Sequence, residues 1–173
     1  MDFEGYDALT LSEEEKELLK TLRRLSDTHK VEYGIAAKGS WISSYFTDHS
    51  PNSVHIPEEI RSLDGVSLYH SHTNETLLSV QDLKLLLKPR ISRIVVISSD
   101  NSVCAAFVGN GYRPDEETFQ NIAYQIYMET GVASFDNPAF EKLSIRERNT
   151  WAINERSYRL ARYFEWTIEG GRL

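Results

Sequence analysis

The spacing of apolar residues predicts four helices along the chain. The first covers residues 13–28, where leucines recur at helical spacing behind the capping-box pattern Ser12-Glu13-Glu14-Glu15. The second covers residues 79–87 and opens at a similar Ser-x-x-Asp step. The third begins at Pro114 or Asp115, and the fourth covers about 144–163. The third should bury one face and end at Gly131, before a loop at 134–138; that face carries Phe119, Ile122, Ala123, Ile126 and Tyr127.

Apolar runs with β-branched residues predict strands between these helices. A hairpin with its turn at 38–40 and a single helical turn at 57–61 are also expected. This order of elements indicates an α/β fold, with a mixed, largely antiparallel sheet flanked by helices and a helical C-terminal extension. The predicted strands cover residues 31–37, 41–47, 54–56, 66–72, 93–98, 103–108 and 164–168.

Composition predicts a single globular domain without a nucleic-acid or membrane partner, but it indicates no activity. The chain has 173 residues, 40% of them hydrophobic, so we expect a single domain over 1–173 with a substantial core. The net charge of −7 argues against a nucleic-acid partner. The sequence has no apolar run near 18 residues and no signal-peptide pattern, which predicts a cytoplasmic protein without a membrane partner. The single Cys104 lies in an apolar run and is expected in the core.

The residues with the clearest chemistry lie between positions 70 and 82. His70 and His72 are two apart on a predicted strand, so their side chains should point to the same face. Asp82 follows in the first turn of the next helix, from which its carboxylate could reach them. Two imidazoles and a carboxylate are the ligands of a catalytic zinc site with one open position. Alternatively, the histidines are half-buried strand residues and Ser79 and Asp82 only form a capping box.

These motifs, together with an earlier glutamate, resemble the JAMM metalloproteases of the MPN (JAB) fold. The family order is a glutamate on an early strand, then His-x-His-Pro, then Ser-x-x-Asp. Here it reads Glu32, His70-Ser71-His72-Thr73 and Ser79-Val80-Gln81-Asp82. The resemblance covers about residues 12–110 and leaves 111–173 as the extension.

The sequence departs from the family pattern at two points. Thr73 stands where the family usually has proline. Six residues separate His72 from Ser79, where the eukaryotic deubiquitinating members usually have seven. The shorter loop and the hairpin before it look more like the bacterial and phage branches of the family, which leaves the identity of the substrate more open than the identity of the metal.

The resemblance implies a role for each motif residue. His70, His72 and Asp82 would bind Zn²⁺, Glu32 would be the general base, and Ser79 would donate a hydrogen bond to the oxyanion. The reaction would be hydrolysis of a peptide or isopeptide bond in a protein substrate, with ubiquitin-like proteins among the candidates.

Non-catalytic interpretations of the same residues also remain open. Glu32 could be an ordinary strand-edge charge. The whole domain could be a non-catalytic MPN scaffold, or a phage- or toxin-associated JAB domain that acts by protein binding. His29, His49 and His55 have no partner at metal-binding spacing and are expected on the surface. Aromatic residues of the last third are expected to serve core and subunit packing or to shape a substrate groove; they are Trp151, Tyr158, Tyr163, Phe164 and Trp166.

Overall fold

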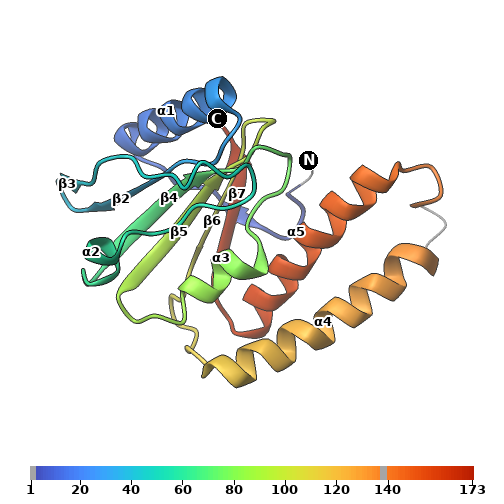
Figure 1. Ribbon diagram of the computed structural model, residues 1–173. Coiled ribbons are helices and arrows are strands. Elements are labelled where there is room, and N and C mark those ends of the chain that lie inside the picture. The colour runs from blue at the N-terminus through green and yellow to red at the C-terminus, as the bar shows by residue number, and fades with distance from the viewer. Residues whose placement is uncertain (1–2, 137–139) are drawn as a thin grey trace.

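The computed structural model describes residues 3–136 and 140–173, and in this part of the chain seven strands form one sheet (Figure 1). The strands are β1 (Asp7–Ala8), β2 (Gly34–Lys38), β3 (Trp41–Ile42), β4 (Val66–Ser71), β5 (Ile91–Ile97), β6 (Ser102–Phe107) and β7 (Thr167–Arg172). The helices are α1 (Glu13–His29), α2 (Glu58–Arg61), α3 (Val80–Leu85), α4 (Glu116–Asp136) and α5 (Ile145–Tyr163).

The strand order is β1-β7-β6-β5-β4-β2-β3. Within the described residues, β4 pairs with β5 and β1 with β7 in parallel, whereas the other neighbours are antiparallel. The predicted α/β class, with a mixed and largely antiparallel sheet, is therefore confirmed. The residues beyond position 110 add more than helices, because β7 returns to the sheet beside β6.

Helices cover both faces of the sheet, and β4 contributes to both cores. Helix α1 lies on one face, while α3 and α5 lie on the other, with α4 packed along α5 (Figure 1). Leu68 belongs to the core that includes Leu83 of α3, and Tyr69 belongs to the core formed with Leu19 of α1. Because alternate residues of a strand share a face, His70 and His72 continue the line of Leu68. Both histidines therefore point to the α3 side.

The predicted helix starts are accurate. Helices α1, α3 and α5 begin after Ser12, Ser79 and Ser144, and each serine forms a capping box with the acidic residue three positions later. The serine oxygen accepts from the backbone N–H of that residue, whose carboxylate accepts from the serine N–H. Helix α2 matches the predicted turn at 57–61, whereas α3 ends at Leu85, two residues before the predicted end.

The strands at the sheet edge differ from the prediction. The strand expected at 31–37 starts only at Gly34, and its hairpin partner, expected at 41–47, ends at Ile42. Beyond that point the chain contacts β2 through one isolated bridge, between Phe46 and Gly34. A Cβ on Gly34 would lie 2.2 Å from the Phe46 ring, so this crossing requires glycine. Residues 54–56 are not a strand, and the short β1 has no clear sequence pattern.

The C-terminal elements also shift. Phe164 caps α5 and Glu165 has a φ of 57°, so the chain turns there and β7 runs over Thr167–Arg172 instead of 164–168. Gly131 does not end α4, which continues to Asp136, so the expected loop is wrong for 134–136; positions 137 and 138 lie outside the described residues. Glycine inside a helix costs only about 1 kcal/mol, which packing against α5 can offset.

The apolar faces of α4 also differ from the prediction. Phe119 is buried as expected, but Tyr127 is 52% exposed. Within the described residues, none of the helices combines the length and the apolar character needed to cross a bilayer.

Candidate metal centre

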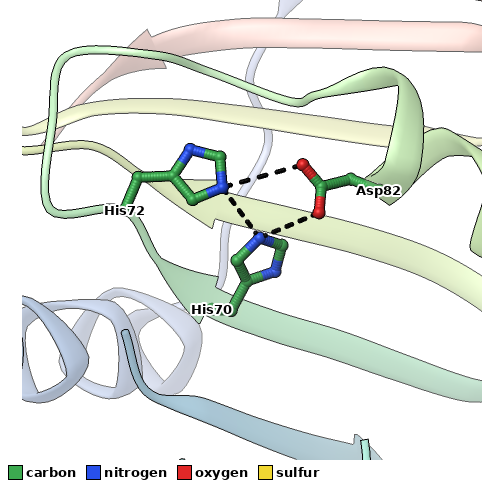
Figure 2. A group of neighbouring side chains, drawn as sticks. All are labelled: His70, His72 and Asp82. Atoms are coloured by element: carbon green, nitrogen blue, oxygen red, sulfur yellow. Dashed lines mark hydrogen bonds and ion pairs between the residues drawn. The ribbon is translucent and has the colours of Figure 1, made fainter. Parts of the chain in front are cut away.

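The imidazoles of His70 and His72 and the carboxylate of Asp82 meet above the end of β4 (Figure 2). The Nε2 atoms of the two histidines lie 3.0 Å apart. Asp82 Oδ1 lies 3.1 Å from His70 Nε2, and Oδ2 lies 3.7 Å from His72 Nε2. One potential ligand atom from each residue falls within 4.8 Å of the others. The structure thus brings together the three predicted ligands.

The capping box of α3 aims Asp82 at the histidines. Ser79 N–H donates to Asp82 Oδ2 at 2.6 Å, and Asp82 N–H donates to Ser79 Oγ at 3.1 Å. The carboxylate is therefore fixed by the helix start while its oxygens face the imidazoles. Capping and ligation, which the sequence left as alternatives, are compatible in this geometry.

Contacts from other parts of the chain orient His72. Its Nδ1 lies 2.9 Å from the carbonyl oxygen of Thr76, so Nδ1 carries the proton and Nε2 keeps a lone pair toward Asp82. Arg23 of α1 donates from Nη1 to the carbonyl oxygen of His72 at 3.0 Å. Leu77 N–H donates to Asn154 Oδ1 of α5 at 2.8 Å. The contacts of Arg23 and Asn154 have no local sequence signal, because each joins residues far apart in the chain.

In the metal-free protein, His72 and Asp82 are in the protonation states that bind a metal, whereas Asp82 favours the protonated form of His70, whose proton a metal would have to displace. Burial lowers the pKa of His72 to about 4, so this imidazole is neutral at pH 7. Burial also acts to lower the pKa of His70, but the charge and hydrogen bond of Asp82 outweigh it and raise that pKa. For Asp82, burial acts to raise the pKa, but His70 and His72 lower it, so the carboxylate is ionised.

The donor atoms that converge here are of the kind that bind a cation. Two nearly buried imidazoles face each other at hydrogen-bond distance beside one carboxylate. Neutral imidazole nitrogens and a carboxylate oxygen are the usual donors to Zn²⁺ at three-ligand sites. In the described part of the chain, no other group of at least three histidine, cysteine, aspartate or glutamate residues converges in this way. The residues present therefore fit a metal ion.

Glu32 lies beside this group but outside it. The antiparallel register pairs Gly34 with His70, and Glu32, two residues before Gly34, lines the same cleft as His70 and His72. Its side chain is 5% exposed. Burial raises the pKa of Glu32 to about 7; His70 opposes this shift, and the nearby Asp82 and Asp48 add to it. A carboxyl group with this pKa can accept and release a proton near neutral pH.

These residues line a cleft of about 530 Å³ that we call the metal-site cleft. The walls of the cleft come from the 46–56 segment, α2, α3 and α5. They were not predicted from the sequence. Both apolar and polar residues line the cleft; besides the five predicted residues Glu32, His70, His72, Ser79 and Asp82, they include Phe46, Asn52, His55, Ile56, Arg61, Leu68, Gln81, Leu85 and Ile153.

The remaining single residues behave as the sequence suggests. His29 and His49 are exposed. His55 is also exposed, although it reaches the rim of the metal-site cleft, where Arg61 Nη2 lies 2.9 Å from its Nε2. Cys104 is fully buried, and burial raises the pKa of its thiol, as expected of a core residue.

Comparisons of the chain with protein-family models, with curated proteins and with solved structures found no match. The functional interpretation therefore depends on the geometry of the cleft and on the order of its residues.

Proposed function

We propose that the chain is a zinc-dependent metallopeptidase of the JAMM type, with an MPN (JAB)-like fold, that hydrolyses a peptide or isopeptide bond. The observation that carries this proposal is the convergence of His70, His72 and Asp82 beside Glu32 in one cleft. The supporting sequence order is the glutamate, the His-x-His pair and the Ser-x-x-Asp step. The topology is compatible, because β2 and β4 are neighbours and α3 follows β4 on the ligand face.

His70 and His72 through Nε2, and Asp82 through its carboxylate, would hold the metal. Zinc in such a site lowers the pKa of a coordinated water to about 7 and polarises a substrate carbonyl. The protein supplies the fixed donors, and Thr76 and Ser79 hold two of them in place.

Glu32 would take the proton from the attacking water. In the metal-free protein its pKa is about 7, so Glu32 can both accept and release a proton near neutral pH. The burial that raises this pKa leaves the side chain 5% exposed in the lining of the cleft.

Ser79 would stabilise the oxyanion that develops on the attacked carbonyl. Its Oγ accepts a hydrogen bond from Asp82 N–H, and a hydroxyl also has one proton to donate. Since Ser79 lines the metal-site cleft, that proton can be directed at a bound carbonyl group.

The test compares wild type with Glu32→Gln on quenched fluorescent peptides and on lysine-linked ubiquitin-like conjugates. We expect the variant to retain stoichiometric zinc by elemental analysis and to lose hydrolysis, because an amide cannot accept the proton. Glu75→Gln is a matched control, since Glu75 is a partly exposed acid between the ligands that pairs with Arg146 at 3.2 Å. Hydrolysis by Glu32→Gln at the wild-type rate would show that Glu32 is not the base. Zinc-loaded wild type that cleaves neither substrate set would favour a binding domain instead.

A further inference from the structure

Helix α4 carries apolar side chains on two sides, although the protein covers only one of them. Phe119 and Ile126 lie in the core. Tyr124, Tyr127 and Met128 are 66%, 52% and 50% exposed. Their spacing of three and four residues places them on one strip of the helix surface. Exposed apolar strips of this kind mark binding surfaces more often than they mark ordinary surface.

Helices α3, α4 and α5 come together on one face of the sheet (Figure 1). Part of the strip lines a groove between residues of these three helices. The groove has a volume of about 510 Å³, and its lining includes one cationic side chain and no carboxylate. We call it the aromatic groove; it is lined by Ser79, Val80, Gln81, Ala123, Tyr124, Tyr127, Ile153 and Arg156.

Arg156 holds one wall of the aromatic groove in place. Its guanidinium lies 4.1 Å from the centroid of the Tyr127 ring, and its Nε donates to Thr130 Oγ1 at 2.9 Å. The guanidinium is thus stacked on the ring and anchored behind it. A wall that is already fixed loses little conformational entropy when a ligand binds.

The aromatic groove continues from the metal-site cleft. Ser79, Gln81 and Ile153 line both of them. Ser79 and Gln81 are separated by about 3 Å along the axis of α3, whereas an extended chain advances about 3.4 Å per residue. A polypeptide with its reacting bond at Ser79 would therefore place a side chain in the groove within about two residues.

We propose that the aromatic groove is a specificity subsite for the protein substrate of this cleft. It would take an apolar side chain of the size of leucine or phenylalanine, one or two residues from the cleaved bond. The lining provides apolar contact and no acidic partner for a lysine or arginine side chain. This inference rests on the proposed function, because the position of the subsite is defined relative to the bond that the peptidase would cleave.

The test uses peptide sublibraries in which each position in turn is fixed as Leu, Phe, Ser, Asp or Lys. Hydrolysis of quenched peptides is measured with the zinc-loaded wild type, and anisotropy of labelled peptides with the zinc-loaded Glu32→Gln protein. We expect one position to prefer Leu or Phe over Ser by at least about tenfold, the usual discrimination of an apolar pocket.

Tyr124→Ser should reduce that preference to less than about threefold, since it removes an apolar wall. Tyr124→Lys, which adds a charge at the same exposed site, should do the same, so the test does not depend on one variant. Tyr124→Phe should retain the preference. Tyr163→Ser is the matched control, because Tyr163 is 55% exposed on α5 and does not line the groove.

The two proposals fail in different ways. Cleavage without an apolar preference, or with a preference that Tyr124→Ser and Tyr124→Lys leave unchanged, would overturn the subsite and keep the peptidase. Binding to Glu32→Gln with a preference that depends on Tyr124, but no cleavage by wild type, would keep the subsite as a binding groove and overturn the peptidase. A wild type that neither binds nor cleaves any sublibrary would overturn both.

Discussion

Glu32 is a carboxyl group whose ionisation competes with folding. Its ordinary pKa of 4.5 rises to about 7 when the chain folds and buries it. Between these two values the folded metal-free protein binds more protons than the unfolded chain does. The free energy of unfolding contributed by Glu32 therefore falls as pH rises through this window.

We expect metal-free Glu32→Gln to match the wild type closely at pH 4.5 and to be more stable at pH 8. The gain should be about 1–3 kcal/mol, because glutamine carries no charge that the fold must bury. Urea unfolding of both proteins in EDTA at the two pH values measures it. If the two proteins differed in free energy of unfolding by the same amount at both pH values, the pKa of Glu32 would not be raised in the folded state.

Arg23 supports the candidate metal site from the opposite face of the sheet. Its guanidinium donates to the carbonyl oxygen of His72, one residue beyond β4, while the N–H of His72 donates to the carbonyl oxygen of Ile97 at 2.8 Å. Arg23→Met should lower the affinity for zinc by about tenfold, a typical effect of losing a contact behind a ligand. Competition with a chromophoric chelator measures the affinity. The neighbouring Arg24 is exposed, so Arg24→Met should leave the affinity unchanged; equal losses in both variants would rule out a specific role for Arg23.

The site residues that the sequence could predict are those governed by local rules. His70 and His72 share a face because strand side chains alternate, and Asp82 is placed by the first turn of a helix. Arg23 and Asn154 escaped prediction because their contacts join distant parts of the chain. Thr76 escaped it because its contact with His72 is made by a backbone carbonyl, which any residue type could supply.

At the scale of elements, the start of α3 has two tasks that can be separated by mutation. Ser79→Ala should cost about 1 kcal/mol of stability through the lost cap and should also reduce hydrolysis. Ser79→Gly should cost only a few tenths of a kcal/mol, since glycine is tolerated at an N-cap, but should still lose activity, since it has no side-chain donor. Thermal unfolding and initial rates measured on the same samples test both effects. Full activity in Ser79→Gly would exclude the hydroxyl as the oxyanion donor.

Helices were easier to predict than strands, for a physical reason. Helices α1, α3 and α5 each begin at a serine followed three residues later by an acidic residue, which is a local sequence pattern. The edge of the sheet instead depends on which segments meet. Phe46 crosses Gly34 after β3 has ended, so the apolar run at 41–47 does not extend the strand.

At the scale of the molecule, a bound metal would join the end of β4 to the start of α3 across the cleft. Zinc binding only to the folded chain should raise its stability by about 2.7 kcal/mol at a hundredfold excess over the dissociation constant. For a domain of this size, that corresponds to about 5–10 °C in melting temperature.

Thermal melts with zinc and with EDTA test this coupling. The His70→Ala/His72→Ala double variant should show no shift, because two of three ligands are gone. His55→Ala, at the rim of the same cleft, should shift like the wild type. A zinc-dependent shift that survives in the double variant would place the metal elsewhere.

The place of β7 in the sheet also sets an order in which the protein can be assembled. Strand β6 is nearly all buried, and one of its two edges pairs with β7, which is made only after α4 and α5. During synthesis on the ribosome, the backbone N–H and C=O groups of that edge stay unpaired while both helices are translated. An open edge can pair with another nascent chain, which is the usual start of aggregation. The yield of folded protein should therefore depend on how fast β7 follows β6 off the ribosome and on chaperones that cover the edge meanwhile.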